Sequence, residues 1–164
     1  MEPYRKRRWR RASSPERIAF YTCARPGRSL SKTEPVSDQI VHKWVKGLPG
    51  PNTTIISLLG RKPDGMSEFS FYTFHSQVDT AGETLNGESF QEWLDHHYND
   101  RRITVVEHPT TDYRGVPQSS LSAIAEDVNR LLADGHTVVL VDSGGQQRTG
   151  KVCEYLGLIE DTRS

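Results

Sequence analysis

The stretch that decides the fold is Val138-Val139-Leu140-Val141-Asp142-Ser143-Gly144-Gly145-Gln146-Gln147-Arg148-Thr149-Gly150. Its first four residues are apolar and mostly β-branched, which predicts a buried strand. A Gly-rich loop follows, and after it the pattern predicts the start of a helix. Backbone N–H groups in such a loop and at a helix N-terminus converge on one place and favour an anion there. Arg148, at the end of the loop, can add two charge-assisted hydrogen bonds to a phosphate.

This loop resembles the phosphate-binding loop of the protein tyrosine and dual-specificity phosphatases. The family pattern is His-Cys, two residues, Gly, two residues, Arg, Ser or Thr, Gly, and Gly145, Arg148, Thr149 and Gly150 match it without gaps. The resemblance covers roughly residues 16–160 and is strongest to the compact bacterial type. It implies that the phosphate-binding residues are Ser143, Gly144, Gly145, Gln146, Gln147, Arg148 and Thr149.

Two positions depart from the family pattern. Val141 stands where the family has His, and Asp142 stands where it has the nucleophilic Cys. The favoured interpretation is that Asp142 fills the loop as an internal anion paired with Arg148 and with loop amides. Asp142 could instead attack phosphorus as a carboxylate nucleophile, a reaction that commonly needs a divalent metal to offset charge repulsion. A third interpretation is a weakened phosphate site.

A second segment, from Glu107 to Pro117, resembles the acid loop of the same family. In that loop an Asp, four residues ahead of a Pro, protonates the leaving oxygen. Asp112 is the matching residue, although Pro117 follows it by five positions. The resemblance therefore implies that the catalytic residues are Asp142, Arg148 and Asp112. The alternative for Asp112 is a turn residue that hydrogen-bonds its own backbone.

The rest of the chain predicts alternating strands and helices. Strands are expected at 17–23, 53–59, 68–75, 103–106 and 137–141. Helices are expected after Ser37, at 89–98, from 119 or 120 to 132, and at 150–156. This alternation predicts a three-layer α/β fold with a mostly parallel central sheet flanked by helices. The phosphate loop then lies at the carboxyl end of a central strand, where such sheets bind ligands.

The 164 residues predict one domain with a tail. Residues 1–15 are expected to be a basic, disordered tail, and residues 16–162 to be the phosphatase-like domain. The segment 5–11 is Arg-Lys-Arg-Arg-Trp-Arg-Arg, which lacks a periodic apolar face. It can contact nucleic acid or an anionic membrane, with Trp9 stacking or inserting, or it is a solvated tail.

The sequence predicts no disulfide framework, no membrane-spanning segment and no metal site. Cys23 and Cys153 do not form a disulfide framework and are predicted to be buried thiols, which favours a cytoplasmic location. No apolar run approaches the roughly 20 residues that span a bilayer. His96 and His97 lack ligand spacing to other candidates, so neither a metal nor another cofactor is predicted.

Three functions remain open at the level of sequence. The favoured one is a catalytically impaired phosphatase-like module that binds phosphate or a phosphoprotein. The alternative is an active phosphomonoester hydrolase of the same type with a non-Cys nucleophile. The second alternative is a polyanion-binding protein that acts through its basic tail.

Overall fold

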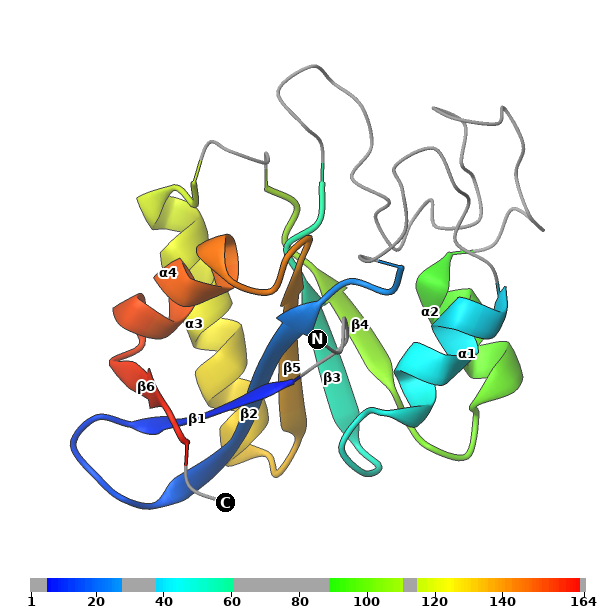
Figure 1. Cartoon of the computed structure of the whole chain (residues 1–164), viewed down its shortest axis with the longest axis horizontal. Helices are drawn as coiled ribbons and strands as arrows, with labels where there is room; N and C mark the ends of the chain where they lie inside the picture. The colour runs from blue at the N-terminus through cyan, green and yellow to red at the C-terminus, as the bar shows by residue number, and fades with distance from the viewer. Residues whose placement is uncertain (1–5, 28–37, 61–88, 111–114, 163–164) are drawn as a thin grey trace.

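A computed structural model describes residues 6–27, 38–60, 89–110 and 115–162. Six strands form one sheet in the order β4-β3-β5-β2-β1-β6 (Figure 1). The strands are β1 (Arg7–Arg11), β2 (Arg17–Ala24), β3 (Thr53–Ser57), β4 (Thr104–Glu107), β5 (Thr137–Asp142) and β6 (Leu158–Glu160). Neighbours among β2, β3, β4 and β5 pair in parallel, whereas β1 is antiparallel to both β2 and β6. The predicted mostly parallel sheet is confirmed.

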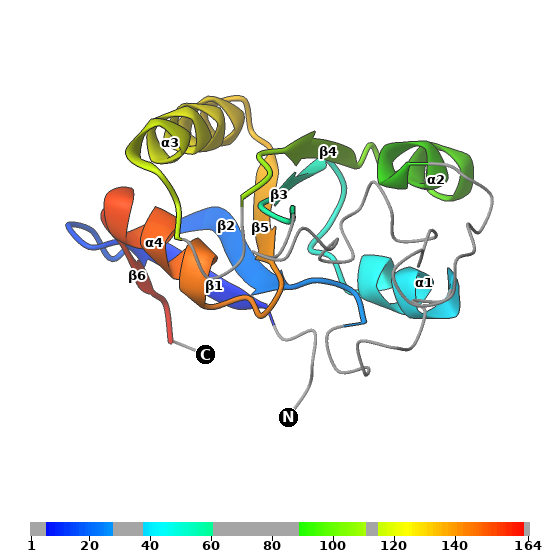
Figure 2. The ribbon, with the colours of Figure 1, turned by 90° about the horizontal axis from the view of Figure 1, so that it is seen from above.

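Helices cover both faces of this sheet. They are α1 (Asp38–Lys46), α2 (Phe90–His97), α3 (Gln118–Ala133) and α4 (Gln147–Tyr155). Figures 1 and 2 show α1 and α2 on one side of the sheet and α3 and α4 on the other. The predicted three-layer α/β class is therefore confirmed. Within the four described segments, no helix is long and apolar enough to cross a membrane.

The central strand β5 is buried on both faces, which explains its continuous apolar sequence. Alternate side chains of a strand point to opposite faces, and here Val139 and Val141 join the cluster under α1 and α2. Val138 and Leu140 join the cluster under α3 and α4. Asp142 continues this second set by register, so its side chain belongs to the α3/α4 side of the sheet.

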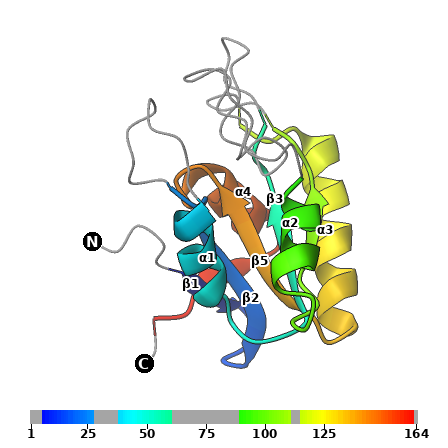
Figure 3. The same ribbon diagram turned by 90° about the vertical axis from the view of Figure 1, so that its right-hand side faces the viewer.

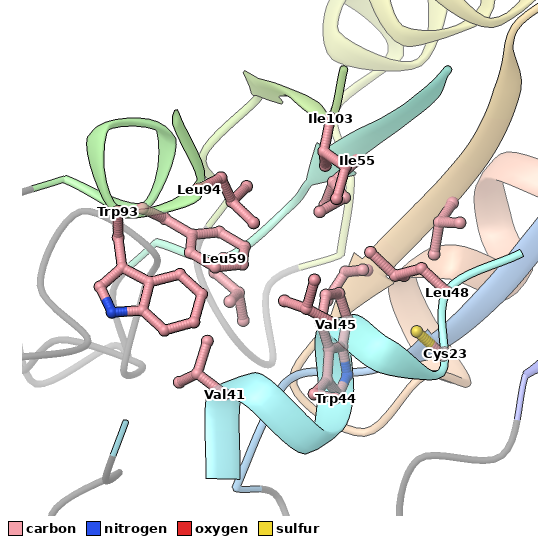
Figure 4. Close-up of a cluster of buried hydrophobic side chains, with 13 residues drawn as sticks. Cys23, Val41, Trp44, Val45, Leu48, Ile55, Leu59, Trp93, Leu94 and Ile103 are labelled. Carbon is pink, nitrogen blue, oxygen red and sulfur yellow. The ribbon is translucent and has the colours of Figure 1, made fainter. Parts of the chain in front are cut away.

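The cluster beneath α1 and α2 includes large side chains from both helices and from the sheet, and Figure 4 shows how they lie. Within this cluster, Val41, Trp44 and Val45 of α1 and Leu48 just after it lie three or four residues apart, as on one face of a helix. Ser89 begins α2 with a reciprocal capping box to Glu92, as a Ser three residues before a Glu favours.

One prediction about the domain limits is wrong. Residues 7–11 are not part of a disordered tail, because they form β1 between β2 and β6. Trp9 explains the difference, since its side chain is buried and its indole Nε1 donates to Thr22 Oγ1 at 2.9 Å. The arginines around it have partners within the chain: Arg8 stacks over Tyr21, and Arg10 donates to backbone carbonyls. Binding of polyanions by residues 5–11 stays a prediction.

Most other elements lie where they were predicted, with shifted ends. The helix α4 begins three residues earlier than expected, at Gln147, and α3 begins at Gln118 with Pro117 as its N-cap. The strand β6 was not predicted. The strand expected at 68–75 lies outside the described residues.

Candidate phosphate-binding site

The candidate site lies where β5 ends and α4 begins. The parallel strands β2, β3 and β5 run side by side in Figure 3, and the segment after β5 turns over their carboxyl ends into α4. Arg25 N donates to the carbonyl of Asp142 at 3.0 Å, and Leu58 N donates to that of Val141 at 2.8 Å. These bonds, from the residues that directly follow β2 and β3, fix the position at which β5 becomes a loop.

The Asp142 side chain is directed at the loop amides. It is 1% exposed, and its Oδ1 accepts a hydrogen bond from Gly145 N. Its Oδ2 accepts a second bond, from Thr149 N, at 3.0 Å. The carboxylate therefore holds two N–H groups that a phosphate loop would otherwise offer to an anion. The prediction that the Asp142 side chain bonds to loop amides is therefore confirmed.

Gly145 is required by this geometry. Its φ is +73°, which side-chain-bearing residues rarely adopt. A Cβ at this position would lie 2.6 Å from the backbone N of Ala24 and 2.6 Å from the carbonyl carbon of Cys23. The loop thus packs its backbone directly against the end of β2, which accounts for a Gly at this position.

Arg148 does not pair with Asp142. Its guanidinium Nη1 donates to Thr110 Oγ1 at 2.7 Å and to the Leu58 carbonyl at 3.2 Å. Thr110 Oγ1 in turn donates to the same carbonyl at 2.6 Å. The predicted ion pair with Asp142 is therefore wrong: Asp142 uses amides, and Arg148 connects the loops that follow β3 and β4.

Four loop amides have no acceptor among the described residues. Within the described residues, no group accepts a hydrogen bond from the N–H of Ser143, Gly144, Gln146 or Gln147. Gly144, Gln146 and Gln147 are exposed, and Ser143 is half-buried. These amides and the N-terminus of α4 can receive an anion from solvent.

The acid-like loop is described only in part. Asp112 lies among residues 111–114, outside the described part of the chain. Thr110, two residues before it, is buried against the loop after β3 and contacts Arg148. His108 Nε2 lies 2.6 Å from Asp127 Oδ2 on α3. Thr110 and Leu58 were missed as site residues because a hydroxyl and a backbone carbonyl give no sequence signal for contact with a distant Arg.

Neither cysteine is a thiolate at neutral pH. Burial raises the pKa of Cys23 to about 12, and Figure 4 shows its sulfur among the apolar side chains of the α1 cluster. Burial likewise raises the pKa of Cys153, on α4, to about 12. Both thiols are free and buried, as predicted, and both stay protonated at neutral pH.

No metal-ligand group is evident in the described segments. Among residues 6–27, 38–60, 89–110 and 115–162, no three His, Cys, Asp or Glu side chains lie close enough to hold an ion. His96 and His97 stack on each other, with ring centroids 4.6 Å apart.

The chain is similar in structure to kinase associated phosphatase, solved with its catalytic-site cysteine replaced by serine. The TM-score is 0.57 at 20% sequence identity, and the match covers 94% of this chain and 73% of that chain. No protein-family model and no curated protein matches the sequence. The structural match and the sheet order together show that this chain has a dual-specificity-phosphatase-like α/β fold, with an Asp at the end of the strand that precedes the loop.

Proposed function

We propose that this domain binds phosphorylated ligands at the loop between β5 and α4 and does not hydrolyse them. One observation carries the proposal: the carboxylate of Asp142 is buried and bonded to the amides of Gly145 and Thr149. Both carboxylate oxygens are thereby engaged, and their charge repels an incoming phosphate from the position of the nucleophile.

Binding is left to the outer part of the loop. The exposed residues Gly144, Gln146 and Gln147 lie at the N-terminus of α4, where the helix dipole favours an anion. Arg148 is 4% exposed and bonded to Thr110. Through its hydrogen bonds, Arg148 holds the loops that follow β3 and β4 beside the site. The ligand class that fits is a phosphate monoester, including a phosphoprotein side chain.

Two measurements on the whole chain test this function. The first is hydrolysis of p-nitrophenyl phosphate, with and without Mg²⁺ or Mn²⁺. We expect no turnover, whereas a rate of about 1 per second or more, abolished by Asp142→Ala, would favour the active hydrolase. The control Asp134→Ala removes an equal charge after α3, at the opposite end of β5.

The second measurement is titration with inorganic phosphate, followed by amide NMR. We expect shifts at Gly144, Gln146 and Gln147 that saturate, and no saturating shift near Asp134. If the loop responds to phosphate neither in the unmodified chain nor in Asp142→Ser, the binding proposal is overturned.

A further inference from the structure

Arg7 of β1 contacts the phosphate loop from outside. Its Nη1 donates to the carbonyl oxygen of Gly145 at 3.3 Å. Its Nε forms an ion pair of 2.5 Å with Glu160 of β6, and its guanidinium lies 4.9 Å from the centroid of the Trp9 ring. Three contacts from three different residues therefore hold this side chain in one place.

The contact with Gly145 determines where a neighbouring amide points. The carbonyl of Gly145 and the N–H of Gln146 belong to one planar trans peptide group, in which they point in opposite directions. Because the carbonyl is turned toward Arg7, the Gln146 N–H is turned away from it. That N–H is one of the amides that the described residues leave without an acceptor. A cation on the carbonyl also polarises the peptide group and makes its N–H a better donor.

We propose that Arg7 is a positioning residue for the anion site, acting through the Gly145–Gln146 peptide group. This inference rests on the proposed function, because it assigns a role in phosphate binding at the same loop. Glu160 and Trp9 support this role because their contacts hold the Arg7 guanidinium in place. The N-terminal strand, expected to be a separate tail, is thus part of the binding site's support.

The test compares Arg7→Gln with Arg7→Lys in the full chain. One readout is affinity for inorganic phosphate, and the second is hydrogen exchange of the Gly145 amide, which needs no ligand. We expect Arg7→Gln to weaken phosphate binding about tenfold and to speed Gly145 exchange by a similar factor, as loss of a hydrogen bond to a charged group implies. Arg7→Lys keeps the charge but not the fork that bonds two acceptors, so it should recover part of both effects.

Two matched controls separate positioning from charge and from general loosening. Arg8→Gln removes the same charge at the next position of β1, whose side chain lies over Tyr21. Arg17→Gln removes the 2.9 Å ion pair with Asp161, which also joins the N-terminal strands to the C-terminal segment. We expect both controls to leave Gly145 exchange and phosphate affinity within about twofold of the unmodified chain, because the contacts described for their side chains are with Tyr21 and Asp161 and not with the loop.

The outcomes are distinguishable. Unchanged Gly145 exchange in both Arg7 variants would overturn the positioning role, as would an equal loss in Arg17→Gln. If no chain, Asp142→Ser included, binds phosphate, the proposed function fails, and Gly145 exchange alone then decides whether Arg7 orders the loop. Thermal melts of each variant show whether a lower phosphate affinity or a faster Gly145 exchange comes from unfolding. If Arg7→Gln unfolds, Arg7→Lys is compared with the unmodified chain instead.

Discussion

The backbone N–H of Thr149, in the first turn of α4, donates a 3.0 Å hydrogen bond to the carboxylate of Asp142, the last residue of β5. Gln146, the N-cap of this helix, provides no side-chain hydrogen bond to the first turn. Asp142 therefore acts as a cap from outside the helix, and its charge complements the helix dipole. Asp142 thus has a structural role, because it holds the loop and the first turn of α4 in place.

This role predicts a loss of stability when the carboxylate is removed. Asp142→Ala leaves the buried amides of Gly145 and Thr149 without acceptors, which should cost about 1–3 kcal/mol of unfolding free energy. Asp142→Asn keeps one acceptor oxygen and should lie between. Urea denaturation measures both, with Asp134→Ala as an exposed control. An Asp142→Ala chain as stable as the unmodified one would show that the two bonds contribute nothing.

Emptying the loop should also change its ligand affinity. Asp142→Ser removes the internal anion and returns two amides to the site, so it should bind phosphate more tightly than the unmodified chain. Thermal melts with and without phosphate measure this, because a ligand that binds only the folded state raises the melting temperature. An equal phosphate shift in both chains would mean that the carboxylate does not compete with the ligand.

The contacts of Arg148 predict which partner it is coupled to. A double-mutant cycle of Arg148→Ala with Thr110→Ala should give a coupling of about 0.5–3 kcal/mol in unfolding free energy, since the two side chains share a buried 2.7 Å hydrogen bond. The matched cycle of Arg148→Ala with Asp142→Ala should give a much smaller coupling. The reverse order would restore the ion pair that sequence reasoning proposed.

The sequence was sufficient for elements whose pattern is local. The apolar run of β5, the helical spacing of α1 and the capping box of α2 each depend on residues within one segment. The strands β1 and β6 have no such pattern: one has a single apolar residue, Trp9, among arginines, and the other has three residues. They pair with each other from opposite ends of the chain, so only tertiary context creates them.

In the candidate site, too, local patterns could be predicted from the sequence and tertiary contacts could not. The spacing from Gly145 to Gly150 predicted a loop between a strand and a helix, and the structure has a loop there. The acidic residue at the start of this loop was correctly interpreted as bonded to loop amides, whereas phosphate binding stays a prediction. The partners of Arg148 could not be predicted, because Leu58 and Thr110 reach it through the close approach of two other loops. Gly60 permits that approach, since a Cβ there would collide with the backbone of Thr110.

Asp127 of α3, which contacts His108 and Arg130, predicts a pH dependence of stability. Partial burial disfavours the charged Asp127 carboxylate, but hydrogen bonds from His108 and Arg130 outweigh this and lower its pKa. A lowered folded-state pKa stabilises the fold above the ordinary Asp value of about 3.9, and this contribution is lost as the pH falls through the folded-state value. Asp127→Asn should therefore destabilise the chain at pH 7 and have less effect at pH 3. Urea midpoints at the two pH values measure this, and an equal loss at both would contradict it.

Strand β1, which the sequence predicted to be part of a tail, is anchored by Trp9. Trp9 is 6% exposed, packs in the cluster beneath α3 and α4, and donates to Thr22. Trp9→Ala should cost about 3–5 kcal/mol, the usual loss for truncating a buried aromatic residue. Trp9→Phe keeps much of the packing but leaves the hydroxyl of Thr22 without its donor, and should cost less. Ile159→Ala, on the exposed side of β6, is the control and should change little. Urea denaturation of the full chains measures all three, and unchanged stability in Trp9→Ala would return residues 7–11 to the tail.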